Sequence, residues 1–160
     1  MNNSGYEFRI ATLDDLDSLV TLWCESSSYH QEIENRFKYA SDAADWTKKY
    51  FSDQLPKDEF TIFVASDDGS IFGFIEAQLM EKPPIHAQRR IGYIGSLYVR
   101  PEYRKKGVGS HLWSLAHDWL KKQDVTKFQL AVAVKNQNGL EFWKHIGFRE
   151  LMFQMERKIN

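Results

Sequence analysis

The sequence is short of the features that mark secreted, membrane-spanning and linker-divided proteins. It holds a single cysteine, Cys24, so no disulfide can form within the chain, and such cysteine usage is typical of a reducing compartment. No N-terminal apolar stretch resembles a signal peptide, and no apolar run approaches the roughly 18 residues of a membrane span. No repeat, linker or low-complexity segment is present. We therefore expect a cytoplasmic protein with one domain over residues 1–160, and no membrane partner.

The charge is also close to balanced. A net charge of −1 gives no global basic field of the kind that favours nucleic-acid binding. The basic residues in the middle of the chain form local clusters instead. Because of these clusters, nucleic-acid binding remains a hypothesis, but the least favoured one. These residues are Arg89, Arg90, Arg100, Arg104, Lys105 and Lys106. We expect no nucleic-acid partner.

The stretch from Tyr93 to Leu112 organises the chain. The apolar run Ile91–Val99 predicts a buried strand, which Pro101 ends because proline cannot donate to a sheet ladder. A basic glycine loop follows, and a helical pattern begins at Val108. Because the first N–H groups of a helix lack internal partners and carry partial positive charge, this arrangement predicts an anion-binding loop. The loop alone equally fits a turn with solvated charges.

Two motifs in order make the assignment more specific. Arg104, Gly107 and Gly109 form the pattern R-x-x-G-x-G, and about thirty residues later Asn136 precedes Gly139–Phe148, reading GLEFWKHIGF. This pair resembles the acetyl-CoA signature of the GCN5-related N-acetyltransferase (GNAT) family. The resemblance implies a mixed α/β sheet, mostly antiparallel, with its fourth and fifth strands splayed apart.

The periodicity of the remaining chain agrees with that fold. Asp67–Ser70 reads as a tight hairpin turn, and Thr12 with Asp15 as a capping box. Gly147 reads as the C-terminal cap of a short helix over Leu140–His145. The expected strands are Tyr6–Ile10, Phe60–Ala65, Ile71–Met80, Ile91–Val99, Phe128–Val134 and Phe148–Arg157, and the expected helices begin at Leu13, after Ser41, at Val108 and at Leu140, the first ending or loosening near Ser26–His30.

The resemblance implies acetyl-CoA as the acetyl donor. In the family, the opened edge of the fourth strand pairs with pantetheine, the glycine loop holds the pyrophosphate through N–H groups, and an asparagine contacts the cofactor arm. The cofactor-binding residues implied here are Leu97, Tyr98, Val99, Arg104, Lys105, Lys106, Gly107, Val108, Gly109, Ser110, Asn136 and Trp143.

The family chemistry is direct transfer of acetyl to a primary amine, which needs a base for the amine and a proton donor for the thiolate. The sequence departs from the family at both usual positions. Trp143 stands where a tyrosine is often proposed as the acid, and Gly95 stands where some members carry a glutamate base. The candidate catalytic residues are therefore Glu76, Tyr93 and Tyr98, with His30 and His145 ranked behind them.

Glu76 leads because of its place in the sequence. It interrupts the apolar run IFGFIEAQL, and a carboxylate on a central strand is costly to bury without a partner. It either faces water at the active cleft or has a partner. The alternative is an ordinary solvent-facing position on the strand.

In the family, the first and second helices and their connection usually form one wall of the acceptor site. By that resemblance the substrate residues here are His30, Glu32, Phe37 and Tyr39, and the alternative is a polar surface loop held by aromatic contacts. Acidic residues favour a cationic acceptor. They are Glu25, Glu32, Glu34, Asp42 and Asp45.

The sequence thus predicts an acetyl-CoA-dependent N-acetyltransferase that acts on a primary amine of a small molecule or peptide. Loss of both usual acid–base residues keeps a second hypothesis open, a non-catalytic acyl-CoA-binding or regulatory domain. Many members of the family pair as dimers, which leaves a homodimer open. Cys24 is expected to be a small residue near the core rather than a nucleophile.

Overall fold

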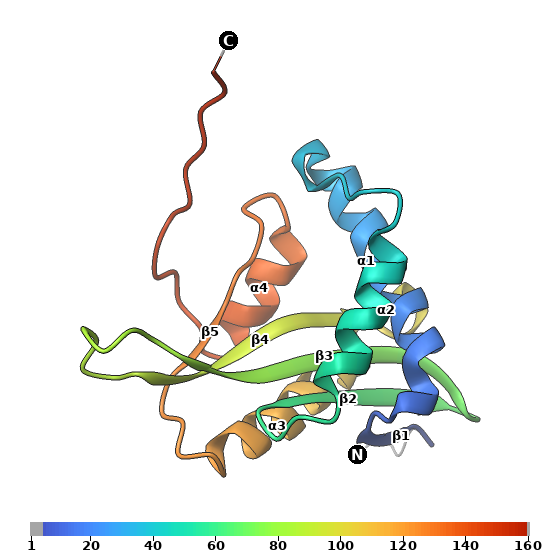
Figure 1. The fold of residues 1–160 in the computed structure, drawn as a ribbon. Coiled ribbons are helices and arrows are strands. Elements are labelled where there is room, and N and C mark those ends of the chain that lie inside the picture. The colour runs from blue at the N-terminus through green and yellow to red at the C-terminus, as the bar shows by residue number, and fades with distance from the viewer. Residues whose placement is uncertain (1–4, 160) are drawn as a thin grey trace.

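The computed structural model describes residues 5–159 and is built on one mixed sheet (Figure 1). Five strands lie side by side in chain order. The first four pair antiparallel, and the fifth runs parallel to the fourth. They are β1 (Glu7–Ile10), β2 (Phe60–Asp67), β3 (Ser70–Glu81), β4 (Arg90–Val99) and β5 (Phe128–Leu130). The predicted fold class, a mostly antiparallel mixed sheet, is confirmed.

Helices cover both faces of this sheet (Figure 1). Helices α1 (Leu16–Ile33) and α2 (Ala43–Gln54) pack on one face, around a core that includes Leu19, Phe51 and Phe74. Helices α3 (Val108–Lys121) and α4 (Gln137–His145) contribute to a second core on the other face. Strands β2 and β3 are therefore buried on both sides, which explains their nearly continuous apolar sequence. Short 3₁₀ turns cover Leu13–Asp15, Asn35–Phe37 and Pro101–Tyr103.

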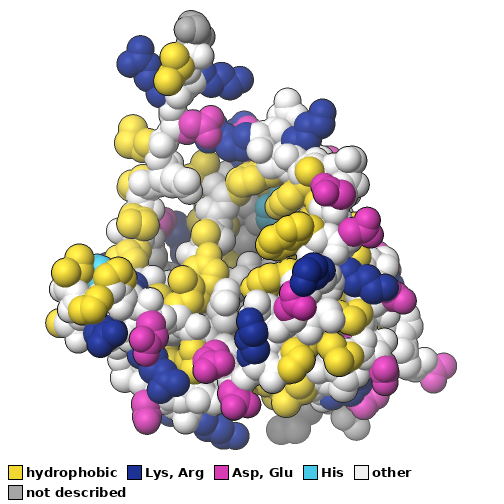
Figure 2. Space-filling view, viewed as in Figure 1, with side chains coloured by type: hydrophobic (Ala, Val, Ile, Leu, Met, Phe, Trp, Pro, Cys, Tyr) yellow, Lys and Arg dark blue, Asp and Glu magenta, His cyan; other side chains and the backbone are white. Residues whose placement is uncertain are grey.

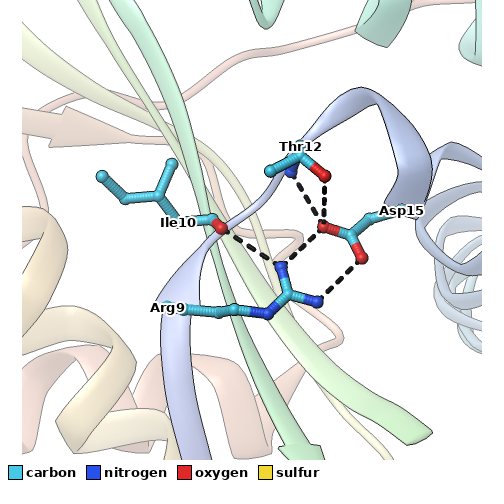
Figure 3. Close-up of polar contacts among 4 residues, drawn as sticks. All are labelled: Arg9, Ile10, Thr12 and Asp15. Atoms are coloured by element: carbon cyan, nitrogen blue, oxygen red, sulfur yellow. Dashed lines mark hydrogen bonds and ion pairs between the residues drawn. The ribbon is translucent and has the colours of Figure 1, made fainter. Parts of the chain in front are cut away.

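The predicted hairpin and capping box both form. Asp68 and Gly69 turn the chain between β2 and β3 with φ of 47° and 81°, the left-handed conformation of a tight turn. Before α1, the Thr12 N–H donates to Asp15 Oδ2 at 2.8 Å. Arg9 donates to both oxygens of the same carboxylate at 2.7 and 2.9 Å, which holds the pKa of Asp15 below its usual value (Figure 3). The cluster thereby ties the end of β1 to the start of α1.

Several predicted boundaries are wrong. Helix α1 continues to Ile33 instead of ending near Ser26–His30, and Asp42 rather than Ser41 is the N-cap of α2. Strand β5 stops at Leu130 instead of Val134, because the chain leaves the edge of β4 there. Among the helices described between residues 5 and 159, none is both long and apolar enough to cross a bilayer.

The predicted last strand, Phe148–Arg157, is also wrong. Residues 149–159 form no strand and project from the body of the molecule (Figure 1). We define them as the C-terminal segment. Its alternating apolar side chains Leu151, Phe153 and Met155 are exposed, Phe153 at 80%. Alternation alone does not make a strand, since a strand also needs a partner for its backbone groups. In this chain the segment is held by surface ion pairs, Lys144 with Glu150 and Arg36 with Glu156.

Candidate active site

Strand β4 carries an irregularity at the centre of the sheet. Glu76 of β3 lies opposite Ser96, but the next residue, Ala77, lies opposite Ile94, so Gly95 is an extra residue in β4. Such a β-bulge bends a strand and disturbs its pairing. Strand β5 pairs with β4 only from Gly92 to Ile94, before the bulge. The described chain therefore leaves the β5-facing edge of Gly95–Val99 without a strand partner, as an opened edge.

The N-terminus of α3 lies just beyond this opened edge in the chain. Gly107 is the N-cap, with a left-handed φ of 81° and no side-chain cap bond. The first helical bond of the turn runs from the His111 N–H to Gly107 O at 3.0 Å, so the N–H groups of residues 108–110 precede it. No acidic residue lies in this first turn. These features suit an anion, because the free N–H groups and the helix dipole act together.

The basic side chains near this loop are not all directed to it. Arg104 donates through Nε to Val99 O at 2.7 Å, and its guanidinium carbon lies 5.6 Å from the Tyr98 ring and 5.8 Å from the Tyr29 ring. Lys106 Nζ lies 5.5 Å from the centre of the Tyr103 ring. Arg104 therefore ties the loop back to the end of β4, while Lys105 is exposed beside the helix terminus.

Asn136 lies at the start of α4, where two segments of the chain meet. Its Oδ1 accepts from the Gly139 N–H at 3.0 Å as a helix cap, and from the Tyr29 hydroxyl at 3.4 Å. Tyr29 belongs to α1, so the contact joins the helices on the two sides of the sheet beyond the end of β5. Figure 2 shows the molecule hollowed between these two sides, with hydrophobic side chains along the hollow.

Glu76 is buried on the α1–α2 face of the sheet. Its side chain is 6% exposed, and it accepts hydrogen bonds from the Tyr50 hydroxyl at 3.3 Å and from the Ser96 hydroxyl. Burial raises the pKa of Glu76 to about 7, although both hydrogen bonds act to lower it. The same burial, with the nearby carboxylate, raises the pKa of Tyr50 to about 12. At neutral pH Glu76 can therefore accept or release a proton while Tyr50 stays a donor.

The glycine at the bulge makes room for this carboxylate. A Cβ on Gly95 would lie 2.6 Å from Glu76 Cδ and 2.9 Å from Oε2, closer than atoms can approach. The Glu76 carboxylate thus occupies the volume that a side chain at position 95 would fill. It also lies directly beside the opened edge of β4.

A pocket of about 440 Å³ leads to Glu76 from the outside of the α1–α2 face. Five aromatic side chains and two carboxylates are among its lining residues. The lining consists of Trp23, Tyr39, Ala40, Asp42, Ala43, Trp46, Thr47, Tyr50, Phe51 and Glu76. Glu76 thus lines this pocket and also contacts Gly95 of the opened edge.

Comparison with known proteins assigns this arrangement to a family. The model described as "Acetyltransferase (GNAT) family" matches residues 21–148, which include the opened edge, the glycine loop and α4. The chain belongs to the GNAT family. The predicted family and enzyme class are thereby confirmed. Members of this family use acetyl-CoA as the acetyl donor.

Individual relatives agree with this assignment. An uncharacterized N-acetyltransferase of Methanocaldococcus jannaschii is 30% identical over 91% of this chain, and the match spans 61% of that relative's length. Another uncharacterized N-acetyltransferase, of Archaeoglobus fulgidus, is 29% identical over 86% of this chain and 88% of its own. A predicted acetyltransferase with acetyl-CoA from Clostridium acetobutylicum has the same fold, with a TM-score of 0.77, 21% identity and 96% of each chain covered.

Some other GNAT relatives are named for amine acceptors. These acceptors include spermidine in Thermoplasma acidophilum, thialysine in Sus scrofa and aminoalkylphosphonate in Salmonella typhimurium. These relatives are 23–32% identical to the chain over the matched residues.

Three further residues that the sequence predicted as catalytic or cofactor-binding in this GNAT chain lie in different environments. Tyr98 is buried in the core on the α1–α2 face of the sheet, the face that also holds Glu76. Burial, and after it the negative charge of Glu25, raises the pKa of Tyr98. Tyr93 lies where β4 pairs with both neighbours, opposite Gln78 and Gln129. Trp143 is buried in the core on the α3–α4 face, 5.2 Å from Phe148 and 5.9 Å from Trp113 between ring centres.

Only one of the four predicted substrate residues lines the GNAT pocket. Tyr39 does, whereas Glu32 is exposed on α1, and His30 packs edge-on against Phe37 at 6.2 Å and contacts Ser26 O through Nδ1. His145 is exposed at the end of α4. Sequence reasoning missed Trp23, Trp46 and Tyr50 as site residues. Their signal was the spacing of two aromatic residues one helical turn apart, at 46 and 50.

Substituting Gly95 with alanine tests how the bulge holds Glu76. The added methyl group would overlap the carboxylate, so we expect Glu76 to move, turnover to fall at least about tenfold, and the protein to lose roughly 1–3 kcal/mol of stability. Thiol release and thermal unfolding measure the two effects. Gly5→Ala is a matched control, since a Cβ there meets nothing within 4 Å. Unchanged activity in Gly95→Ala would show that the position of Glu76 does not matter.

Proposed function

We propose that this GNAT protein transfers the acetyl group of acetyl-CoA to a primary amine, with Glu76 as the general base. The observation that carries the proposal is the position of the Glu76 carboxylate. The carboxylate is buried between the pocket and the opened edge of β4, and its pKa of about 7 suits proton transfer at neutral pH.

Two features support acetyl-CoA as the donor in this chain. The N–H groups of residues 108–110, with Lys105 exposed beside them, suit a pyrophosphate, and Gly107 allows the sharp turn that directs them. The opened edge of Gly95–Val99 offers backbone groups to an extended pantetheine arm, as in strand addition. Leu97 and Tyr98 lie within this edge. Asn136 lies at the start of α4, after β5 has separated from β4. The Arg104 side chain donates a hydrogen bond to Val99 O, so we do not assign it to the pyrophosphate.

The chemistry follows from these positions. Glu76 takes a proton from the ammonium group, directly or through water, which frees the nitrogen lone pair to attack the thioester carbonyl carbon. A strand N–H of β4 hydrogen-bonds the carbonyl oxygen as negative charge builds on it. The C–N bond forms, the C–S bond breaks, and the departing thiolate takes a proton. Tyr98 is the proposed donor of that proton because its raised pKa keeps it protonated, and Tyr93 is the alternative.

Thiol release from acetyl-CoA across a panel of amines tests the proposal, with calorimetric acetyl-CoA binding measured alongside. We propose a cytoplasmic location because the chain has a single cysteine, and the assay is therefore run in reducing buffer. We expect release with at least one amine class. Acetyl-CoA binding without release for any amine would support the alternative function, a non-catalytic acyl-CoA-binding domain. Absence of binding would refute the proposed donor site.

We also propose that the protein forms a homodimer through the C-terminal segment. Its apolar side chains Leu151, Phe153 and Met155 are exposed on a segment that stands away from its own body (Figure 2). Exposed apolar residues in such a row mark an interaction surface, and within residues 5–159 no strand pairs with the outer edge of β5, which leaves its backbone groups for a strand of another chain. A second copy can supply both partners by symmetry.

The double variant Phe153→Asp with Met155→Asp is expected to convert the dimer to a monomer, because two charges would be placed in the apolar contact. Light scattering after size exclusion measures the mass, which should fall by half. Arg157→Asp, also in the segment, is a control for charge alone. A monomeric parent protein would contradict the proposal.

A further inference from the structure

We infer that the acceptor is a monoamine carried on a flat, apolar body, such as an arylalkylamine. The inference rests on the proposed function and concerns the pocket that leads to Glu76. The shape, charge and size of that pocket all favour such an acceptor.

The pocket has aromatic walls. On the α2 side, Trp46 and Tyr50 are stacked with ring planes 12° apart and centres 6.0 Å apart. Trp23 of α1, also in the lining, meets Tyr39 edge to face at 5.1 Å. Flat aromatic walls favour a flat apolar ligand, because stacked and edge-on ring contacts add to the gain from burying apolar area. Trp46 is 69% exposed, which leaves a large apolar surface for a ligand to cover.

The charge in the pocket suits a single ammonium group. Glu76 is the buried carboxylate, and among the lining residues, all within the described chain, none is Lys, Arg or His. The other lining carboxylate, Asp42, is exposed at the start of α2, where water screens its attraction. One cation can thus be paired at the inner end of the pocket, beside the opened edge of β4.

Two of the five acidic residues that predicted a cationic acceptor, Glu25 and Glu34, are paired outside the pocket. Glu25 forms a two-pronged ion pair with Arg100 at 2.8–3.2 Å, and Glu34 pairs with Lys135 at 2.9 Å. Neither lines the pocket. A polyamine or aminoglycoside would therefore bring further ammonium groups against apolar walls, and an unpaired buried charge is costly. The pocket selects against such acceptors.

Size points the same way. About 440 Å³ lies toward the small end of the roughly 300–1,000 Å³ of pockets that hold drug-sized ligands. That volume suits one or two fused rings with a short aminoalkyl chain, and it is small for the linked sugar rings of an aminoglycoside.

The test compares kcat/KM for 2-phenylethylamine, tryptamine, methylamine, spermidine and kanamycin. We expect the two arylalkylamines to exceed spermidine and kanamycin by at least about 100-fold, since one unpaired ammonium group left in an apolar site costs several kcal/mol. A higher value for spermidine or kanamycin would overturn the inference.

Trp46→Ala gives a second, residue-specific measurement. We expect it to raise KM for 2-phenylethylamine by at least about tenfold, as for a buried aromatic anchor, and to leave the value for methylamine, which has no body to stack, unchanged. Lys49→Ala, on α2 but outside the pocket lining, is the matched control. An equal effect of Trp46→Ala on both amines would contradict the inference.

Direct binding separates this inference from the proposed function. Calorimetric titration of 2-phenylethylamine and of spermidine into the CoA-saturated protein needs no turnover. Tighter binding of 2-phenylethylamine without thiol release would support the pocket assignment and refute the transfer reaction. Tighter binding of spermidine would refute the pocket assignment whether or not acetyl transfer occurs.

Discussion

Glu76→Gln is expected to lower kcat by about 10²–10³-fold, with acetyl-CoA affinity nearly unchanged. Glutamine has the shape of glutamate and can still accept from the Tyr50 hydroxyl, but its amide cannot take a proton from the ammonium group. Loss of a positioned general base typically costs 10²–10⁴-fold. Thiol release measures kcat, and calorimetry measures acetyl-CoA binding.

The pH dependence gives this prediction a second readout. Glu76 acts as a base only when ionised, and its pKa is about 7, so kcat of the parent protein should rise from about pH 6 to about pH 8. The rise should be absent in Glu76→Gln. Tyr50→Phe removes a hydrogen bond that lowers the pKa of Glu76, and should therefore move the rise to higher pH. A rise that persists at the same pH in Glu76→Gln would exclude Glu76 as the base.

The same substitution should affect stability in the opposite direction. The folded-state pKa of Glu76 is raised from 4.5 to about 7, so between these values the folded protein holds more protons than the unfolded one. Stability therefore falls as pH rises through this window, by an amount on the order of 3 kcal/mol for such a shift. Glu76→Gln should unfold at a higher temperature than the parent at pH 8 and should lose this advantage at pH 4. Thermal unfolding at the two pH values measures the difference.

Gly107→Asp is expected to weaken acetyl-CoA binding by at least about 100-fold. The substitution would place a carboxylate at the helix terminus that we assign to the pyrophosphate, where like charges repel. Asp is a favourable N-cap only in an extended backbone, whereas Gly107 has a left-handed φ of 81° that side chains adopt at a cost of about 1–2 kcal/mol. Calorimetry with acetyl-CoA measures the affinity.

Gly107→Ala separates strain from charge. A Cβ at this position meets nothing within 4 Å, so alanine adds the backbone strain alone. We expect it to lose some stability and to keep most of the affinity. Gly109→Asp should also abolish binding, with added crowding, because its Cβ would lie 3.3 Å from the Phe142 ring. A folded Gly107→Asp protein that binds acetyl-CoA as the parent does would refute the assignment of this loop.

The organising strand, glycine loop and helix could be predicted because their signals are local. Pro101 ends β4, Gly107 caps α3, and Asn136 caps α4, each within a few residues of the feature it determines. The splay of β4 from β5 came from the family resemblance and not from periodicity. The apolar pattern of β5 continues to Val134, yet pairing stops at Leu130.

The pocket could not be predicted from local signals. Glu76 and Gly95 are 19 positions apart, and their contact depends on the register of two strands and on the bulge between them. Trp46 and Tyr50 have the spacing of a core-facing pair, but α2 presents them at the pocket instead. Two of the five acidic residues that predicted a cationic wall, Glu25 and Glu34, pair with Arg100 and Lys135, which lie far along the chain and were not expected as partners.

The contact between Glu76 and Gly95 also constrains how this sequence can change over generations. One side-chain volume is shared by two positions on adjacent strands, so a glutamate gained at position 95 alone would place two carboxylates in the same space. A glycine gained at position 76 alone would leave no carboxylate at either position. Any lineage that moves the carboxylate from one strand to the other must therefore pass through an impaired intermediate, and residues 76 and 95 are expected to be inherited as a pair.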